Sequence, residues 1–339
     1  MNPEGKDFGT TKSGLETRLY HIEDGKGLSA DLTDYGATVV SLTFTDSKGK
    51  ERDLVRGYED AADYEESGCY FGACIGRNAN RIGNAEFSLD GAVYRLAAND
   101  GKNNLHSGPD TYNKRLWAVE ETGKDYITFS LNSPDMDQGF PGNLKVRMTY
   151  RTVDNRFELE YEAVSDRDTV INFTNHSFFN LNGHDGGPVF NHIVTLKAEE
   201  YTESSKALIP TGRRLPVTGT ALDFTKGRRL GEALESGALP LYDDNFCLSS
   251  KPGEQAGEVY APESGIGMKI YTDLPGMQIY TPPVAQGKGK KDTPYGPFGA
   301  VCFETQYFPD AVHQPAFKSP VYKAGEVYKT KTVYAFYRR

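Results

Sequence analysis

The chain has 339 residues and a formal net charge of -9, with 47 acidic residues against 38 basic ones. Because a protein that grips nucleic acid needs clustered lysine and arginine to neutralise phosphates, this balance argues against a nucleic-acid partner. Hydrophobic residues make up 37% of the chain and aromatic residues 12%, which supplies ample bulky material for a packed core. Composition therefore predicts a globular, soluble protein.

Neither a membrane span nor a secretion signal is predicted. No stretch approaches the roughly 20 apolar residues of a spanning helix, and the N-terminal run MNPEGKD lacks the apolar core of a signal peptide. Cys69, Cys74, Cys247 and Cys302 are irregularly spaced, so buried free thiols are expected. These features favour a reducing, cytoplasmic setting, and an exported mature form that has lost a leader stays open.

Strand-like alternation of apolar and polar residues recurs from end to end. It covers residues 38–45, 127–131, 146–151, 157–164, 268–272 and 327–336. Residues 85–96 predict a hairpin, because Asp90-Gly91 suits a two-residue turn whose central residues have positive φ. A similar turn signal follows at Asp154-Asn155. No long helix is predicted.

Glycine and proline are scattered, and neither a linker nor a repeat divides the chain. We therefore expect one domain over residues 1–339, an all-β fold built as a large antiparallel β-sandwich. The one biased stretch, residues 287–292 (GKGKKD), is predicted to be a solvated basic loop. A phosphate-binding loop would need a Walker-type or strand-to-helix context that is missing there.

Three short polar blocks carry groups for acid–base chemistry. They are residues 103–106 (NNLH), 174–177 (TNHS) and 303–306 (FETQ), and they supply His106, His176 and Glu304. Since the chain shows no metal motif, nucleotide loop or plausible cysteine nucleophile, proton transfer is the favoured chemistry. Glu304 lies in an apolar and aromatic run, and burial there would raise its pKa above the free value of about 4.3.

Each of these groups also has a structural interpretation. His176 could be satisfied by a neighbouring backbone group, and Glu304 could form a structural ion pair. His106 lies in a turn-rich loop, where a binding role and a structural one are equally open. The histidine spacings match no metal-ligand motif, so no metal site is expected.

Side chains suited to a polyhydroxylated ligand lie in two further segments, residues 76–83 (GRNANRIG) and 242–246 (YDDNF). Sugars present fixed hydroxyls that arginine, aspartate, asparagine and glutamine hold by hydrogen bonds, while aromatic faces cover the C–H side. For Arg77 and Arg81 a structural salt bridge is the alternative.

Taken together, these segments resemble the galactose mutarotase (aldose 1-epimerase) family along almost the whole chain. The matching pieces, in order, are residues 35–38 (YGAT), 57–58 (GY), 76–82 (GRNANRI), 103–106 (NNLH), 174–181 (TNHSFFNL), 210–212 (PTG), 223–224 (DF), 242–246 (YDDNF), 278–281 (QIYT) and 304–311 (ETQYFPDA). The resemblance implies a galactose mutarotase-like supersandwich with a sugar cleft across one sheet. It also implies an isomerase that interconverts the α and β anomers of free hexoses such as galactose and glucose, without cofactor or metal.

The resemblance also implies roles for individual residues. Glu304 would be the base that takes the proton from the C1 hydroxyl, and His176 the acid that protonates the ring oxygen. His106 would hold the ring-oxygen side and help position the sugar. The hydroxyls would be held by Asn80, Arg81, Asp243 and Gln278.

Two departures from the family pattern leave the preferred sugar open. Asp244 stands where the family often has histidine, and Pro282-Pro283 replaces a frequent Gly-Asn pair. An added carboxylate and a stiff Pro-Pro segment could reshape one wall of the cleft.

Other functions remain open at this point. An epimerase of phosphorylated hexoses would want a basic phosphate pocket, for which Arg77 and Lys102 are available. A non-catalytic carbohydrate-binding domain could use the same cleft without turnover. A glycosidase usually needs two carboxylates, of which only Glu304 can be nominated. The expected partner is a monosaccharide, and the oligomeric state is left open.

Overall fold

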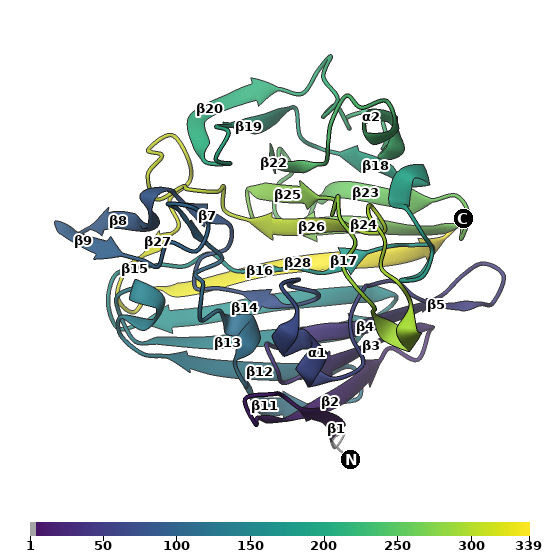
Figure 1. The fold of residues 1–339 in the computed structure, drawn as a ribbon, viewed down its shortest axis with the longest axis horizontal. Coiled ribbons are helices and arrows are strands. Elements are labelled where there is room, and N and C mark those ends of the chain that lie inside the picture. The colour runs from purple at the N-terminus through teal and green to yellow at the C-terminus, as the bar shows by residue number, and fades with distance from the viewer. Residues whose placement is uncertain (1–4) are drawn as a thin grey trace.

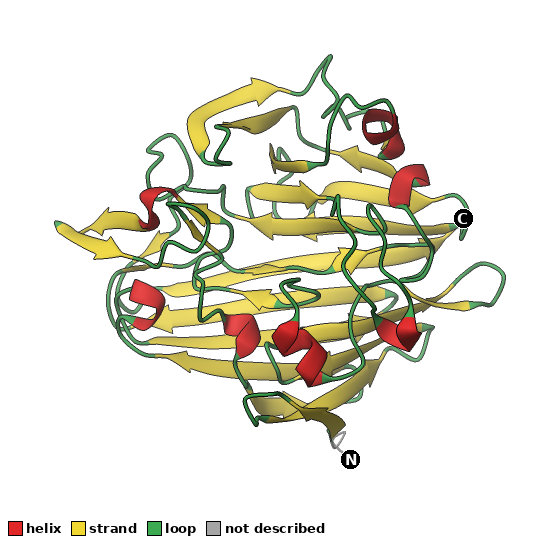
Figure 2. Cartoon of the chain, in the orientation of Figure 1, coloured by secondary structure: helices red, strands yellow, loops and turns green. Residues whose placement is uncertain are grey.

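The computed structural model describes residues 5–339, and strands dominate this part of the chain (Figure 2). Its two α-helices are short, α1 (Ala61–Glu66) and α2 (Gly231–Glu235). Single 3₁₀ turns lie at Gly83–Ala85, Tyr112–Lys114, Asp137–Gly139, Val189–Asn191 and Lys290–Asp292. None of the helices within residues 5–339 is long and apolar enough to cross a membrane. The all-β prediction is confirmed.

One antiparallel sheet of nine strands forms the back layer, in the order β11-β12-β13-β14-β28-β24-β23-β18-β21. In Figure 1 its strands run across the molecule from β11 near the bottom to β18 near the top. The bounds are β11 (Ala118–Thr122), β12 (Tyr126–Ser133), β13 (Leu144–Val153), β14 (Arg156–Ser165), β18 (Ile193–Leu196), β21 (Arg228–Arg229), β23 (Gln255–Ala261), β24 (Ile266–Thr272) and β28 (Val327–Arg338). The alternating segments predicted after residue 100 all lie within these strands.

Two further antiparallel sheets pack on the inner face of the nine-stranded sheet. The five-stranded one contains β1 (Lys6–Thr10), β2 (Glu16–Glu23), β3 (Leu28–Thr33), β4 (Thr38–Thr45) and β5 (Glu51–Asp53). The six-stranded one contains β17 (Phe178–Phe179), β26 (Val301–Gln306), β25 (Gly276–Tyr280), β22 (Asp243–Cys247), β19 (Glu200–Ser204) and β20 (Pro210–Pro216). Buried apolar side chains from all three sheets form one continuous core, which is the construction of a sandwich.

Four short two-stranded pairs within residues 5–339 complete the fold. They are β6 (Cys74–Ile75) with β16 (Thr174–Asn175), β7 (Arg81–Ile82) with β10 (Asn104–Leu105), β15 (Thr169–Val170) with β27 (Val321–Tyr322), and β8 (Glu86–Leu89) with β9 (Ala92–Arg95). The β8–β9 hairpin, which projects at the left of Figure 1, turns at Asp90 and Gly91, whose φ angles are 52° and 78°. Asp154 and Asn155, at 51° and 58°, turn β13 into β14. Both turn predictions are confirmed.

The prediction of a solvated loop at residues 287–292 is wrong for Lys290, which is buried. Its ammonium group donates to Oδ2 of Asp53 at 2.5 Å and to the carbonyl oxygens of Val40 at 2.6 Å and Val55 at 2.9 Å. A lysine tolerates burial when its charge is paired and its donors are satisfied. The loop is therefore anchored to the five-stranded sheet, while its neighbours Lys288 and Lys291 stay exposed.

Candidate active site

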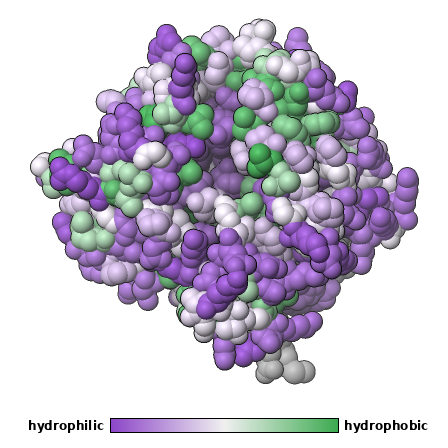
Figure 3. Space-filling view, in the orientation of Figure 1, coloured by the Kyte–Doolittle hydropathy of each residue, from purple (hydrophilic) through white to green (hydrophobic). Residues whose placement is uncertain are grey.

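A cavity of about 350 Å³ opens where β22, β25 and β26 meet β7 and β10. The face drawn in Figure 3 is hollowed in this region. All seven residues singled out from the sequence line it: Asn80, Arg81, His106, His176, Asp243, Gln278 and Glu304. The fold thus brings together side chains that are separated by as much as two thirds of the chain.

Strand alternation points Glu304 into the cavity. Its neighbours on β26 face the core: Phe303 is part of the main apolar cluster, and Thr305 Oγ1 lies 2.6 Å from Thr332 Oγ1 of β28. Because successive side chains of a strand point to opposite faces, Glu304 faces away from that core. Gln278 lies directly opposite Glu304 on the adjacent strand β25.

A second hydrogen bond extends this polar row to β22. Nε2 of Gln278 donates to Oδ1 of Asp243 at 2.7 Å. Asp243 is paired with Tyr280 across the strands, and both line the cavity. Asp244, the next residue, does not line the cavity, whereas Pro283 does.

The backbone of His176 is held in the short connection between β16 and β17. Its N–H donates to the Ala73 carbonyl at 2.9 Å, and its carbonyl accepts from Gly72 N–H at 3.1 Å. Only glycine fits at position 72, because its φ is +64° and a Cβ there would lie 2.0 Å from the Val39 carbonyl oxygen. The imidazole stacks on the rings of Phe178 and Tyr70, with centroids 5.0 and 5.6 Å away.

His106 and Asn80 hold one another through two reciprocal hydrogen bonds. The His106 N–H donates to the Asn80 carbonyl at 3.0 Å, and the Asn80 N–H donates to Nδ1 of His106 at 3.1 Å. Both residues have positive φ, 52° and 61°, a conformation that costs about 1–3 kcal/mol for a non-glycine residue and clusters at functional sites. Because Nδ1 accepts this hydrogen bond, the neutral ring carries its proton on Nε2.

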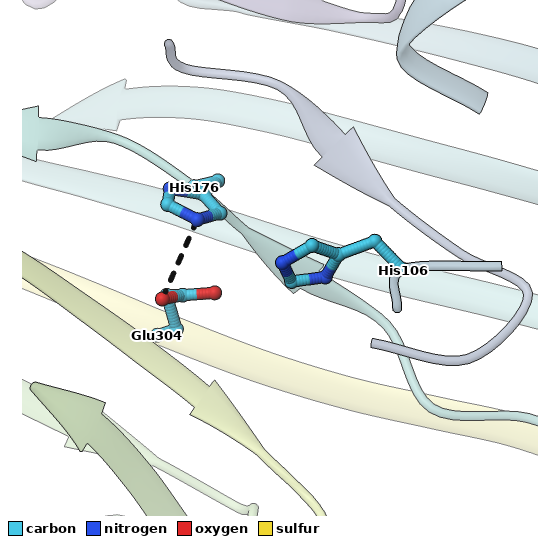
Figure 4. A group of neighbouring side chains, drawn as sticks. All are labelled: His106, His176 and Glu304. Carbon is cyan, nitrogen blue, oxygen red and sulfur yellow. Dashed lines mark ion pairs between the residues drawn. The ribbon is translucent and has the colours of Figure 1, made fainter. Parts of the chain in front are cut away.

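The three acid–base groups converge at one place (Figure 4). Nε2 of His176 lies 3.6 Å from Oε1 of Glu304, and the ring centroids of His106 and His176 are 5.5 Å apart. The other carboxyl oxygen of Glu304, Oε2, is buried and has no hydrogen-bond partner among residues 5–339. An unsatisfied buried acceptor is costly, so this oxygen is suited to receive a ligand's hydrogen bond.

Burial sets the protonation states of this cluster. It raises the pKa of Glu304 to about 8, and the negative charge of Asp243 adds to that rise, while Arg81 opposes it. The same burial lowers the pKa of His176 to about 4. The pKa of His106 also lies well below its usual value, through burial and the nearby His176 and Arg81. Near neutral pH the Glu304 carboxyl therefore carries a proton and both imidazoles are neutral.

The same three side chains place their N and O donor atoms within 4.8 Å of one another, close enough to surround a metal ion. A metal would need the lone pair on Nε2 of His106. The hydrogen bond from the Asn80 N–H to Nδ1 places the ring proton on Nε2, so Nε2 has no free lone pair. The donor set therefore fits a metal poorly.

The two arginines of residues 76–83 have different roles. Nε of Arg81 lies 2.7 Å from Oδ2 of Asp100, so the salt-bridge alternative holds for Arg81, which nevertheless lines the cavity. Arg77 is buried away from the cavity and donates to Ser133 Oγ and the Pro141 carbonyl. Arg81 is the one cation among the residues lining the cavity, and Lys102 is not among them, which speaks against a phosphate pocket.

Several cavity residues escaped the sequence analysis. Tyr70 stacks on His176 and lies 4.9 Å from the His106 ring centroid; its place in the run Cys69-Tyr70-Phe71 marked it only as aromatic. Gln286 and Cys69 also line the cavity, and no local pattern singles them out. Cys69 is half-buried, while the other three free thiols are buried.

Comparison with known proteins decides the family. Residues 18–335 match the family model described as Aldose 1-epimerase. The chain belongs to the aldose 1-epimerase family. It is 38% identical to the galactose mutarotases of Sus scrofa and Homo sapiens, over 332 residues and 97% of each chain. It is 32% identical to the aldose 1-epimerase of Escherichia coli K12 over 333 residues, 95% of this chain and 96% of that one.

Solved structures agree with this membership. A crystal structure of an aldose epimerase homologue from C. elegans matches with a TM-score of 0.91 at 31% identity, covering 95% of this chain and 99% of that one. A galactose 1-epimerase from Lactobacillus acidophilus matches with a TM-score of 0.85 at 22% identity, covering 100% and 99%, which supports the fold alone. The predicted family, the mutarotase-like fold and the enzyme class are confirmed: the chain is an isomerase of the epimerases that act on carbohydrates.

Proposed function

We propose that this aldose 1-epimerase interconverts the α and β anomers of free hexoses, with galactose and glucose as the first substrates to test. The observation that carries the proposal is the buried pair of Glu304 and His176, 3.6 Å apart, with a carboxyl oxygen left without a partner at a polar cavity. Around this pair, Asn80, Arg81, Asp243 and Gln278 offer hydrogen bonds to sugar hydroxyls.

The reaction needs one proton shared by the pair. For catalysis Glu304 must be ionised, to act as the base, while His176 is protonated, to act as the acid. This ionic arrangement holds one proton, the same number as the neutral arrangement, in which Glu304 is protonated and His176 is neutral. Burial favours the neutral arrangement. A bound sugar favours the ionic one, because its C1 hydroxyl donates to the carboxylate and its ring oxygen accepts from the imidazolium.

Ring opening follows from these positions. Glu304 takes the proton of the C1 hydroxyl as His176 protonates the ring oxygen, so the C1–O5 bond breaks and the open-chain aldehyde forms. Rotation about C1–C2 exposes the other carbonyl face, and reclosure with the two groups in reversed roles gives the opposite anomer. Each positioned acid or base contributes about 10²–10⁴-fold to such a step. The Nε2–H of His106 donates to the ring-oxygen side and holds the sugar in place.

Polarimetry of freshly dissolved α-galactose and α-glucose tests the proposal. The wild-type protein is expected to speed the approach to the equilibrium rotation, and Glu304→Gln and His176→Ala are expected to lose that acceleration. Asp244→Asn, a carboxylate one residue from Asp243 but outside the cavity, is the matched control and keeps it. If the wild-type protein binds either sugar but leaves the spontaneous rate unchanged, the chain is a non-catalytic binding domain and the proposal fails.

A further inference from the structure

Gln286 reaches the cleft from the loop that follows β25, and its amide has a fixed orientation. Its Oε1 accepts a hydrogen bond from Nη1 of Arg56 at 2.5 Å. Because a guanidinium group only donates, the carbonyl side of the amide must face Arg56 and the NH₂ side must face the other way. There, Nε2 lies 3.6 Å from Sγ of Cys69, which is a weak acceptor, so the amide keeps a donor for a ligand.

The loop that carries Gln286 is anchored at several points. Arg56 is buried, donates to the Gly296 carbonyl at 3.1 Å and lies over the Tyr295 ring at 4.6 Å. Four residues beyond Gln286, Lys290 pairs with Asp53 in the five-stranded sheet. The loop and the Gln286 side chain therefore lose little conformational entropy when a ligand binds. Such preorganisation favours specific recognition.

The position of Gln286 identifies the part of the sugar that it meets. Its contact Cys69 packs against the apolar cluster that contains Phe178, whose ring stacks on His176, so Gln286 lies on the histidine side of the cleft. Gln278 pairs with Glu304 across the strands and belongs to the opposite side. In the proposed function His176 serves the ring oxygen. The carbon next to that oxygen, C5, bears the C6 hydroxymethyl group in a hexopyranose and only hydrogens in a pentopyranose.

We propose that Gln286 donates a hydrogen bond to the C6 hydroxyl of a bound hexopyranose and so makes the cleft prefer hexoses to pentoses, with Arg56 as the positioning residue. This inference rests on the proposed function. It also specifies a neutral C6 group, because Arg56 does not line the cavity and its Nη1 and Nη2 donate to Gln286 and Gly296.

The test compares kcat/KM for three sugars that differ only at C6: D-galactose, 6-deoxy-D-galactose and L-arabinose, which has the galactose configuration without C6. Wild-type protein is expected to favour D-galactose about three- to tenfold over 6-deoxy-D-galactose, the range of one neutral hydrogen bond. Gln286→Met keeps the length of the side chain but removes the donor. It is expected to lower kcat/KM for D-galactose to the value for 6-deoxy-D-galactose, and to leave kcat/KM for the other two sugars unchanged.

L-arabinose acts as the internal control for folding, since it has no C6 hydroxyl to lose. Gln314→Met removes a glutamine that bonds the Pro210 carbonyl outside the cleft and is expected to change none of the three values. The inference is overturned if wild-type protein shows no preference for D-galactose over its 6-deoxy form, or if Gln286→Met lowers all three sugars alike. If wild-type protein accelerates none of them, the proposed function fails as well.

Discussion

Nε2 of His176 and Oε1 of Glu304 lie 3.6 Å apart, with the two side chains only 7% and 3% exposed. The same desolvation acts on both but in opposite directions: it raises the pKa of the carboxyl group to about 8 and lowers that of the imidazole to about 4. Between these values the pair holds one proton. Anomer exchange by the proposed route needs this single-proton state, since one group must give a proton while the other takes one.

The pH dependence of kcat/KM is therefore expected to be bell-shaped. Above about pH 8 the pair loses its only proton and has no acid, and below about pH 4 it gains a second and has no base. Initial rates of galactose mutarotation from pH 3 to 10, corrected for the uncatalysed reaction at each pH, measure the two limbs. A profile that keeps rising above pH 9 would contradict a role for a single shared proton.

Asp243 is expected to control the alkaline limb. Its negative charge helps to raise the pKa of Glu304, so Asp243→Asn should move that limb to lower pH. The variant should also lower kcat/KM about tenfold or more, because a hydrogen bond from a sugar hydroxyl to a charged group is lost. Asp244→Asn is the control, since Asp244 lies outside the cavity and should leave the limb where it is. An unmoved limb in Asp243→Asn would contradict the electrostatic coupling.

Sequence patterns could predict the strands because their buried and exposed residues alternate locally. β4, predicted as residues 38–45, has those bounds in the structure, and Asp90-Gly91 encodes its own turn through the φ angles that it allows. Glu304 could also be predicted as a buried carboxyl, because the apolar residues Val301, Cys302 and Phe303 precede it on β26. Its high pKa follows from that burial.

Contacts between distant segments could not be predicted in this way. Lys290 meets Asp53 across 237 residues, and Gln286 meets Arg56 across 230. No sequence pattern within residues 287–292 distinguishes a buried lysine that forms an ion pair from a lysine exposed to solvent. The sequence therefore predicts solvent exposure for the whole stretch. The sequence places Pro282-Pro283 of the loop after β25 at the cleft wall, whereas the position of Gln286 in the same loop follows only from the folded chain.

The tautomer of His106 leads to a prediction about its substitutes. Since Nδ1 accepts a hydrogen bond from the Asn80 N–H, the ring proton lies on Nε2, and in the proposed function this Nε2–H donates to the sugar. Glutamine places an amide NH₂ near the position of Nε2, whereas asparagine reaches only to the position of Nδ1. His106→Gln should therefore retain at least tenfold more activity than His106→Asn, with KM carrying most of the difference. Equal losses would mean that the ring acts through some other feature.

His106 should leave the shape of the pH profile unchanged, because its pKa lies well below the neutral range and its role in the proposal is to donate without titrating. A bell with the same two limbs in His106→Gln, at a lower maximum, is the expected result. Displacement of the acidic limb alone would instead place His106 among the groups that exchange protons with the sugar.

The stability of the protein should also show the burial of Glu304. A carboxyl group whose pKa is about 8 in the folded state and 4.5 in the unfolded chain keeps its proton when folded and loses it on unfolding between these values. The unfolded state then binds fewer protons, so the free energy of unfolding falls as pH rises from about 4.5 to about 8. The total loss is at most about 5 kcal/mol, at about 1.4 kcal/mol for each pKa unit.

Glu304→Gln removes this penalty, because the amide is neutral at every pH and has nearly the same shape. Its Tm should match that of the wild-type protein at pH 4, exceed it increasingly up to about pH 8, and then keep a constant lead. Thermal unfolding of both proteins at intervals of one pH unit measures the difference. Asp244→Asn serves as the control for replacing an acid by its amide, because Asp244 is half-buried and lies outside the cavity. A lead of Glu304→Gln that is independent of pH would place the folded-state pKa of Glu304 near its unfolded value and would remove the basis for the alkaline limb.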